Sequence, residues 1–395
     1  MTGGQRARDL PPAAAAVAMV MALAACGTLS RNAVPEGSDL GDVLAGPGPI
    51  RIWGDSTPKD MLTLARQRDA QYRAAGVDPS GLMNYLAVSG GGSDGAFGAG
   101  LLVGWSEAGT RPKFDLVTGV STGALIAPLA FLGSAHDPEL KEIYTSYGLN
   151  DIARRRPLFT IAAEASVADN APMAGLIARY VTDEFLARVA AEHRKGRRLL
   201  IGTTHLDAQR PVIWNMGEIA ARGDEKATKL FRTIMLASAA IPGVFPPVLI
   251  SVEQDGRTFD EMHVDGGVAS QVFLFPVQFD PRAIDRRLGR TPTRRLFVVR
   301  NGRLNPEWET VEPQIMKIAG RSISSLIKYQ GRGDVDRMYG QSRRYGVDFN
   351  LASIPPSFIE REKEPFDLRY MNALFDVGYD LGRRGYHWQK KPPDL

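Results

Sequence analysis

A serine between two glycines is the first residue of this chain whose setting suggests chemistry. Gly119-Val120-Ser121-Thr122-Gly123 fits the pattern G-x-S-x-G and lies between a short apolar segment and a segment rich in Ala, Leu and Ile. Where this motif joins a strand to a helix, the serine occupies a strained turn and its hydroxyl stands above the sheet edge. The positive helix N-terminus then favours an oxyanion nearby. The motif predicts a nucleophile, and the alternative for so short a pattern is a serine that caps a helix.

A cluster of glycines precedes this motif. Residues 90–95 read GGGSDG and follow an apolar segment, so their amides are expected to face an anion at a helix start. The spacing also fits a dinucleotide-binding turn, and Asp115 lies about 20 residues on, where a ribose-binding acid would be sought. However, Asp115 leads directly into the serine motif, so both glycine turns would share one sheet edge. This favours an oxyanion hole formed by Gly90, Gly91 and Gly92 beside the nucleophile.

The base that would activate the serine is less obvious. Asp265 lies between a short apolar stretch and the pair Gly266-Gly267, where the chain can turn sharply, although Asp-Gly turns are common. None of the histidines sits in a catalytic motif; they are His136, His193, His205, His263 and His387. His387 leaves open a triad in the Ser, Asp, His order of α/β-hydrolases, but it lies in a basic tail.

Alternating strands and helices are needed to position these motifs. Short apolar runs predict strands, and amphipathic segments of about 10 to 15 residues predict helices. The expected strands are Tyr85–Ser89, Phe114–Thr118, Leu199–Thr203, Val212–Asn215, Met262–Val264 and Arg295–Val299, and the expected helices are Ala96–Ser106, Ala124–Leu132 and Glu225–Ala239. The fold class is therefore α/β, with a mostly parallel sheet covered on both faces.

Three motifs in this order resemble those of one family. Residues 90–95, 119–123 and 265–267 are similar to the glycine-rich loop, the serine elbow and the Asp-Gly-Gly/Ala motif of the patatin-like phospholipases. Residues 237–247 are similar to the segment that usually precedes the aspartate of that family. The resemblance covers about residues 84–275 and implies a three-layer α/β/α fold with a mostly parallel central sheet.

The resemblance also implies a mechanism. Ser121 would be the nucleophile, Asp265 would accept its proton, and Gly90, Gly91 and Gly92 would form the oxyanion hole. The implied reaction is hydrolysis of lipid carboxylic esters, of the lipase or phospholipase A type, through an acyl-enzyme. The supporting motif glycines are Gly95, Gly119, Gly123, Gly266 and Gly267. No cofactor or metal is expected, because no cluster of His, Cys, Asp or Glu has ligand spacing.

One residue departs from the family pattern. The family's glycine loop usually has Arg or Lys before its last glycine, where this chain has Asp94. A carboxylate facing the site would repel a phosphate headgroup, which puts phospholipid preference in doubt more than ester hydrolysis. A lipid-anchored binding protein of the same fold that has lost catalysis is therefore an alternative function.

The N-terminus carries an export signal. Residues 13–25 form an unbroken apolar run after two arginines; the run is shorter than the roughly 20 residues that span a bilayer, and it fits a secretory signal. It ends in LAAC, which resembles the lipobox of bacterial lipoproteins, and Cys26 is the only cysteine. The resemblance implies removal of residues 1–25, acylation of Cys26 and a place in the bacterial envelope. Gly27, in place of Asp, implies the outer rather than the inner membrane; an ordinary signal peptide is the alternative.

The remaining sequence suggests four regions. Residues 1–25 are the expected signal peptide, 26–56 a flexible tether, 84–278 the catalytic domain and 279–395 a C-terminal α/β extension packed on it. Within the extension, residues 312–329 have helical amphipathicity; we expect them to pack on the sheet, with lining a lid or binding a membrane as alternatives.

Charge excludes one class of partner. The net charge is only +4, and the basic clusters have no interleaved aromatic residues, so a nucleic-acid groove is not expected. The expected partners are a lipid ester and the membrane that holds Cys26; the oligomeric state stays open.

Overall fold

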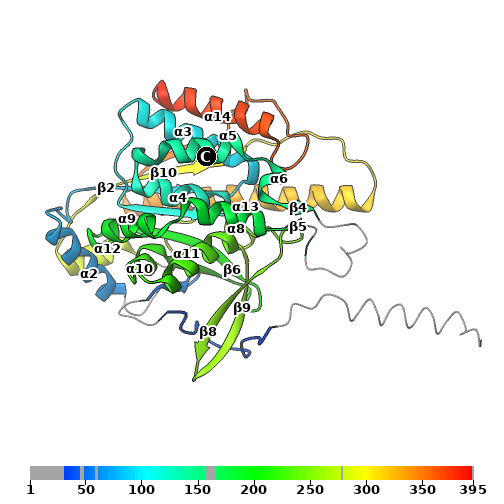
Figure 1. Ribbon diagram of the computed structural model, residues 1–395. Helices are drawn as coiled ribbons and strands as arrows, with labels where there is room; N and C mark the ends of the chain where they lie inside the picture. The colour runs from blue at the N-terminus through cyan, green and yellow to red at the C-terminus, as the bar shows by residue number, and fades with distance from the viewer. Residues whose placement is uncertain are drawn as a thin grey trace, which may run out of the picture.

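In the described part of the chain, a nine-stranded central sheet organises the protein (Figure 1). The computed structural model describes residues 31–44, 49–57, 61–155, 166, 168–276 and 279–393; the predicted signal peptide and Cys26 lie outside them. The main strand order is β1-β7-β6-β3-β2-β10-β11, and β9 pairs with both β6 and β8. The bounds are β1 Arg51–Trp53, β2 Leu82–Val88, β3 Leu116–Val120, β6 Arg198–His205, β7 Arg210–Asn215, β8 Val248–Gln254, β9 Arg257–Asp265, β10 Thr293–Arg300 and β11 Asp348–Ser353.

The five strands β6, β3, β2, β10 and β11 are parallel, as the sequence predicted. The other strands join the sheet antiparallel: β7 and β9 pair with β6, β1 pairs with β7, and β8 forms a hairpin with β9. The predicted strand Met262–Val264 is the last part of β9, which is longer than expected because the hairpin extends it. A separate two-stranded pair joins β4 (Arg154–Arg155) to β5 (Ala168–Asp169).

Helices cover both faces of the sheet. Alternate strand residues point to opposite faces. Leu86, Val88 and Val299 belong to the core that holds α3, α4, α9, α11 and α14, whereas Tyr85 and Ala87 belong to the second core, with α2 and α13. These helices are α2 Met61–Ala74, α3 Gly95–Glu107, α4 Thr122–Leu132, α9 Asp183–Arg194, α11 Glu225–Ser238, α13 Ile315–Tyr345 and α14 Leu368–Arg383. The three-layer α/β/α prediction is confirmed.

The remaining helices are shorter. They are α5 Asp137–Ser146, α6 Leu149–Ile152, α8 Ala171–Tyr180, α10 Met216–Ala220 and α12 Pro281–Leu288, with 3-10 turns η1 Gly92–Asp94, η2 Ser134–His136 and η3 Gly266–Val268. Side-chain caps fix two helices that matter for the site. The Asp224 carboxylate accepts a hydrogen bond from the Ala227 amide at the start of α11, and Asp367 caps α14 in the same way.

Helix α13 differs from its predicted packing. It runs for 31 residues, and its buried side chains, such as Val335 and Met338, lie in its second half. Residues 315–320 are all exposed, so the expectation that the amphipathic segment 312–329 packs on the sheet is wrong. Amphipathicity shows that a helix has an apolar side but does not show what covers it.

The segment predicted to be a flexible tether is attached to the domain where it is described. The Arg31 side chain pairs with Asp207, and Asp42 forms a β-bridge with Glu253 of the β8–β9 hairpin. Further along, Arg51–Trp53 is an edge strand of the sheet. This part of residues 26–56 therefore lies on the fold rather than apart from it.

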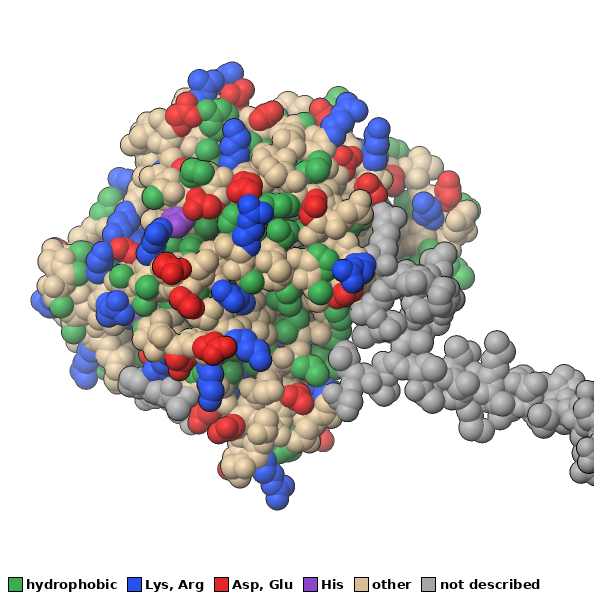
Figure 2. Space-filling view, viewed as in Figure 1, with side chains coloured by type: hydrophobic (Ala, Val, Ile, Leu, Met, Phe, Trp, Pro, Cys, Tyr) green, Lys and Arg blue, Asp and Glu red, His purple; other side chains and the backbone are tan. Residues whose placement is uncertain are grey.

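Acidic and basic side chains are interspersed over the face seen in Figure 2. This mixture agrees with the small net charge of +4. Among the described residues, no helix has the length and apolar composition needed to cross a membrane.

Candidate active site

Strand β6 brings the predicted nucleophile and base together. Along β6, Gly202 pairs with Val120 at the end of β3, and the next residue, Thr203, pairs with Asp265 at the end of β9. Ser121 follows Val120 directly. Two residues 144 positions apart in the chain (265 − 121 = 144) are therefore neighbours at one sheet edge.

Ser121 occupies the strained turn that the motif predicted. Its φ is 54° and its ψ is −126°, a backbone conformation that side-chain-bearing residues rarely adopt. Helix α4 begins at the next residue, so the hydroxyl lies at the helix N-terminus. The Ser121 amide donates to Ser238 Oγ (3.1 Å), and the Ser238 hydroxyl donates to the Gly202 carbonyl (2.6 Å). Ser238, at the end of α11, thus fastens the turn to β6.

Asp265 is a buried carboxylate with one oxygen in use. Oδ1 accepts a hydrogen bond from the Gly267 amide (2.7 Å), while Oδ2 is buried without a hydrogen bond of normal geometry among the described residues. Burial raises the pKa of Asp265 to about 7, although the neighbouring Ser121 side chain and the Gly267 amide act to lower it. A carboxyl with a pKa near neutrality is suited to accept a proton and return it.

The motif glycines lie where chain segments approach closely. A Cβ atom at Gly123 would overlap the carbonyl oxygen of Val88, so only glycine fits where α4 passes β2. The other motif glycines are similarly confined: the nearest atoms are the Gly123 carbonyl for Gly119, the Gly202 carbonyl for Gly266, the Thr122 side chain for Gly95 and the Gln271 side chain for Gly267.

The glycine-rich loop supplies fewer free donors than predicted. The Gly90 amide donates to the Gln271 carbonyl (2.9 Å), so its single proton is already used and the assignment of Gly90 to the oxyanion hole is wrong. The amides of Gly91 and Gly92 make no hydrogen bond within the described part of the chain. Gly92 has a φ of 56° and borders the pocket beside Ser121.

A buried arginine that the sequence did not single out holds this loop. Arg300 Nη1 donates to the Gly90 carbonyl (2.8 Å) and to Ser89 Oγ (3.0 Å). Because a trans peptide directs its C=O and N–H in opposite directions, the Gly91 amide points away from Arg300. No motif marked Arg300 in the sequence. Ser238 belongs to the family-like segment 237–247, but that resemblance gave it no role, since both residues act through backbone groups of another segment.

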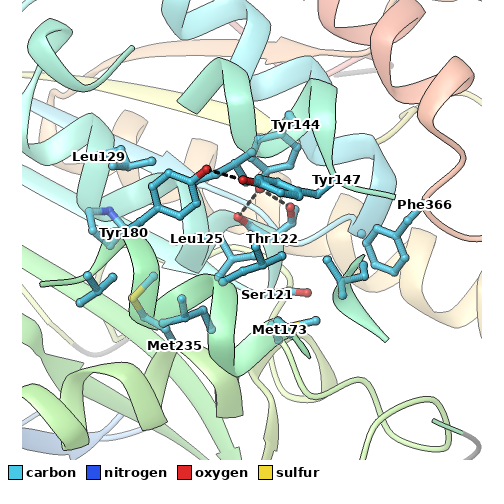
Figure 3. Close-up of a pocket in the computed structure, with 18 of the residues that line it drawn as sticks. Ser121, Thr122, Leu125, Leu129, Tyr144, Tyr147, Met173, Tyr180, Met235 and Phe366 are labelled. Carbon is cyan, nitrogen blue, oxygen red and sulfur yellow. Dashed lines mark hydrogen bonds between the residues drawn. The ribbon is translucent and has the colours of Figure 1, made fainter. Parts of the chain in front are cut away.

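Ser121 borders a largely apolar pocket (Figure 3), which encloses about 920 Å³ with its open mouth included. The hydroxyls of Tyr144, Tyr147 and Tyr180 are engaged with Thr122 or with each other, so they add little free polarity. The apolar lining residues are Leu125, Pro128, Leu129, Ile143, Ile152, Met173, Leu176, Ile177, Val181, Phe185, Met235, Ala239, Ile241, Phe366 and Met371. Such a pocket suits an acyl chain.

Comparison with known proteins agrees with this geometry. The sequence profile of the Patatin-like phospholipase family matches residues 86–277, which contain the glycine loop, Ser121 and Asp265. The chain carries a patatin-like phospholipase domain. The resemblance of the sequence motifs to that family is thereby confirmed, and the family supports lipid acyl hydrolysis in general.

Solved structures that are similar to this chain include VipD from Legionella pneumophila. The match has 11% sequence identity, a TM-score of 0.33 and coverage of 76% of this chain. The match spans 66% of the VipD chain. A search of the curated proteins gave no match.

The acidic residue of the patatin-like glycine loop is turned away from the pocket. The Tyr370 hydroxyl of α14 donates to Asp94 Oδ1 (2.5 Å), and Asp94 does not border the pocket that holds Ser121. Burial raises the pKa of Asp94 to about 6, against the opposing effect of the Tyr370 hydrogen bond. The reason to doubt phospholipids as substrates is therefore weaker than the sequence suggested.

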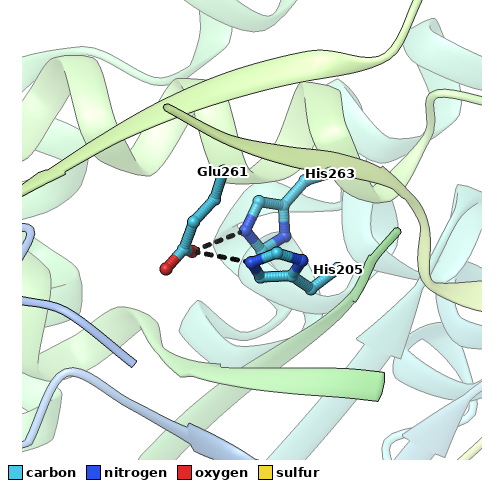
Figure 4. A group of neighbouring side chains, drawn as sticks. All are labelled: His205, Glu261 and His263. Carbon is cyan, nitrogen blue, oxygen red and sulfur yellow. Dashed lines mark hydrogen bonds and ion pairs between the residues drawn. The ribbon is translucent and has the colours of Figure 1, made fainter. Parts of the chain in front are cut away.

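A cluster beside the patatin-like site has the residue types of a metal centre (Figure 4). His205, Glu261 and His263 are buried, and one ligand atom of each lies within 4.8 Å of the others. Arg51, however, binds Glu261 through both Nη atoms (2.5 and 3.1 Å) and brings its own positive charge. The Ala208 amide points at His205 Nδ1, which leaves the proton on Nε2, the atom that faces Glu261. These donors do not fit a cation; they join β1, β6 and β9 as a hydrogen-bonded ion pair.

His387 does not complete a triad with the patatin-like dyad residues. It is exposed, and it precedes Trp388, whose ring packs on Trp105. Trp105 lies ten residues beyond Gly95 in α3, which is about 15 Å along the helix axis. No hydrogen bond in the described chain joins His387 to Ser121 or Asp265.

Proposed function

We propose that this protein hydrolyses carboxylic esters of lipids, with Ser121 as nucleophile and Asp265 as its base. The observation that carries the proposal is the pairing of β6, which makes Asp265 a neighbour of Ser121 in the sheet, and Ser121 borders the pocket. Two further observations support it: the positive φ of Ser121, and the buried Asp265 Oδ2, which has no hydrogen bond of normal geometry among the described residues.

The proposed reaction has two halves. Ser121 Oγ attacks the ester carbonyl and forms a C–O bond while its proton passes to Asp265. The negative oxygen that develops is stabilised by the Gly91 and Gly92 amides and by the N-terminus of α4. Asp265 then returns the proton to the leaving alcohol, which gives an acyl-enzyme. In the second half a water molecule gives a proton to Asp265 and attacks the acyl carbon. The bond between Ser121 Oγ and the acyl carbon then breaks, the carboxylic acid leaves, and Asp265 returns the proton to Ser121 Oγ.

The substrate class follows from the pocket. Its apolar walls are suited to a fatty acyl chain, and the polar part of the lipid would remain at the open mouth. Arg300 is buried against the glycine loop, and Asp94 faces Tyr370, so neither side chain is aimed at a headgroup. We infer that the acyl chain, more than the headgroup, determines binding.

The test is hydrolysis by the purified full chain of three substrates: p-nitrophenyl butyrate, a diacylglycerol and a phosphatidylcholine. Turnover of at least one, with labelling of Ser121 by a fluorophosphonate probe, is the expected result. A folded protein that hydrolyses none of them and is not labelled would contradict the proposal and favour a binding protein of this fold.

Asp94 provides a prediction about selectivity. We expect Asp94→Asn to change the ratio of phosphatidylcholine to diacylglycerol hydrolysis by less than about twofold, because the amide still accepts the Tyr370 hydrogen bond and the side chain lies off the pocket. The exposed Asp376→Asn is the matched control. A large rise in phosphatidylcholine hydrolysis in Asp94→Asn alone would show that this carboxylate repels the headgroup.

We also propose that the protein is held in a bacterial envelope by acylation of Cys26. The support is the sequence LAAC after an apolar run, with no other cysteine in the chain. When the full chain is expressed in a bacterial host with labelled palmitate, label should enter the protein and vanish in Cys26→Ser. Label retained in Cys26→Ser, or absent from the wild type, would count against the anchor.

A further inference from the structure

The first half of α13 stands away from the body of the domain (Figure 1). Its large apolar side chains are exposed to solvent: Ile315 is 84% exposed, Met316 80% and Leu326 71%. Trp308, which precedes the helix, is 89% exposed. Apolar exposure on this scale is unusual for a side of a protein that faces only water.

The exposed residues form one continuous face. At 100° per residue, the helix directs Ile315, Ile323 and Leu326 to the middle of an apolar arc. Further members of that arc are Met316, Ile318, Ile327 and Tyr329, all of them exposed. We call residues 315–329 with this arc the apolar face of α13.

The opposite side of the same segment is cationic. Lys317, Arg321 and Lys328 share it, and no acidic residue occurs between Ile315 and Asp334. Arg321 and Lys328 also pair with Glu309 and Glu307 of the preceding loop. A helix with bulky apolar residues on one side, and with Lys and Arg as the only charged residues of the same segment, is suited to lie in the headgroup plane of an anionic bilayer.

The middle of α13, just after the apolar face, contacts the segments that carry the catalytic motifs. Gln330 Nε2 donates to the carbonyl of Val268 (3.2 Å), three residues beyond Asp265. Gly331 packs against the guanidinium of Arg300, which holds the Gly90 carbonyl. A surface that binds through residues 315–329 would therefore lie next to the site.

We propose that the apolar face of α13 docks into the surface of an anionic phospholipid bilayer. About 15 residues of helix span roughly 22 Å, enough for several aliphatic side chains to enter the acyl boundary together. Docking would hold the domain at the interface where lipid esters are found. The docking itself does not depend on the proposed hydrolysis, and only the second readout below rests on that function.

The experiment measures tryptophan quenching in the full chain. Vesicles of phosphatidylcholine and phosphatidylglycerol with brominated acyl chains quench a tryptophan that enters them. Tyr329→Trp places such a reporter on the apolar face, and the chain without this substitution gives the background. We expect quenching that is stronger on these vesicles than on pure phosphatidylcholine, that weakens with salt, and that is lost in the triple variant Ile315→Ser, Ile323→Ser, Leu326→Ser. The apolar N-terminal run is common to all variants, so their differences report on α13. Val77→Ser, a change at an exposed apolar residue elsewhere, is the control.

The second readout is hydrolysis. The triple variant should lose about tenfold or more in rate on vesicle phospholipid and keep its rate on p-nitrophenyl butyrate. A chain that hydrolyses nothing but shows the quenching pattern would refute the proposed function and leave the docking supported. Quenching absent from Tyr329→Trp, or unchanged when the triple substitution is added to it, would overturn the docking. A wild-type dimer that the triple variant converts to monomer, without quenching, would assign the face to a second copy and also overturn it.

Discussion

Ser121→Ala should lower kcat/KM for every ester that the protein hydrolyses by at least about 10³-fold, the scale of loss when a nucleophile is removed. The hydroxyl is the atom that would carry the acyl group, and no other serine is held in a positive-φ turn in the described chain. Labelling by a fluorophosphonate should vanish together with activity. Binding of the acyl chain should remain, because the pocket walls are unchanged.

Ser121→Ala should leave the fold unchanged, so its effect on activity can be assigned to the lost hydroxyl. Alanine keeps the Ser121 amide that donates to Ser238 Oγ, so the turn stays fastened and the melting temperature should change little. Ser134→Ala, at an exposed serine in η2, should leave both activity and labelling intact. Activity that survives in Ser121→Ala would move the nucleophile elsewhere and remove the basis of the proposed mechanism.

Asp265→Asn should lower kcat by about 10²- to 10⁴-fold, the usual contribution of a general base. Asparagine still accepts the Gly267 hydrogen bond through its carbonyl oxygen, so the geometry of η3 is kept while the basic oxygen is lost. In the wild type the base is the carboxylate, so kcat/KM should rise with pH and level off above the pKa of about 7. The residual activity of the variant should lack this step.

The same substitution should affect stability in the opposite direction. The pKa of Asp265 in the folded protein, about 7, exceeds the ordinary value near 3.9, so the folded state holds a proton that the unfolded state has lost between these pH values. The contribution of Asp265 to the free energy of unfolding therefore falls as pH rises from about 4 to about 7. Asp265→Asn should remove this fall and gain stability relative to wild type at pH 8, measured by urea unfolding.

A matched substitution separates these effects from a general loss of charge. Asp376→Asn, at an exposed position on α14, should alter neither the pH profile nor the pH dependence of unfolding. If Asp265→Asn retained the wild-type rate, or if its pH profile kept the step near 7, Asp265 would not be the base.

Much of the site could be predicted because short local sequence motifs specify it. The elbow at Ser121 needs glycine on both sides and a strand-to-helix junction, and both requirements can be read within a few residues. Gly90 was assigned wrongly because its amide is used by Gln271, a residue 181 positions away (271 − 90 = 181), and no local pattern reports such a partner. Arg300 and Ser238 were missed for the same reason.

The sequence also predicted part of the fold and missed part of it. Buried parallel strands such as Leu116–Val120 appear as short apolar runs, whereas β8, where exposed and buried residues alternate, and the three-residue β1 carry too weak a signal. The helix at α13 was recognised from its period, but its packing was not, since an apolar stripe fits a sheet and a lipid surface equally well.

The pairing of β6 also decides where this protein can change in length. The β8–β9 hairpin turns at Asp255 and Gly256, both with positive φ, far along the ladder from Asp265. Residues inserted at that tip would lengthen the hairpin and leave the site alone. A single insertion or deletion between Glu261 and Asp265 would shift the last pairs with β6 by one residue and turn Asp265 to the other face of the sheet. Length variation is therefore expected at the hairpin tip and excluded from the final residues of β9.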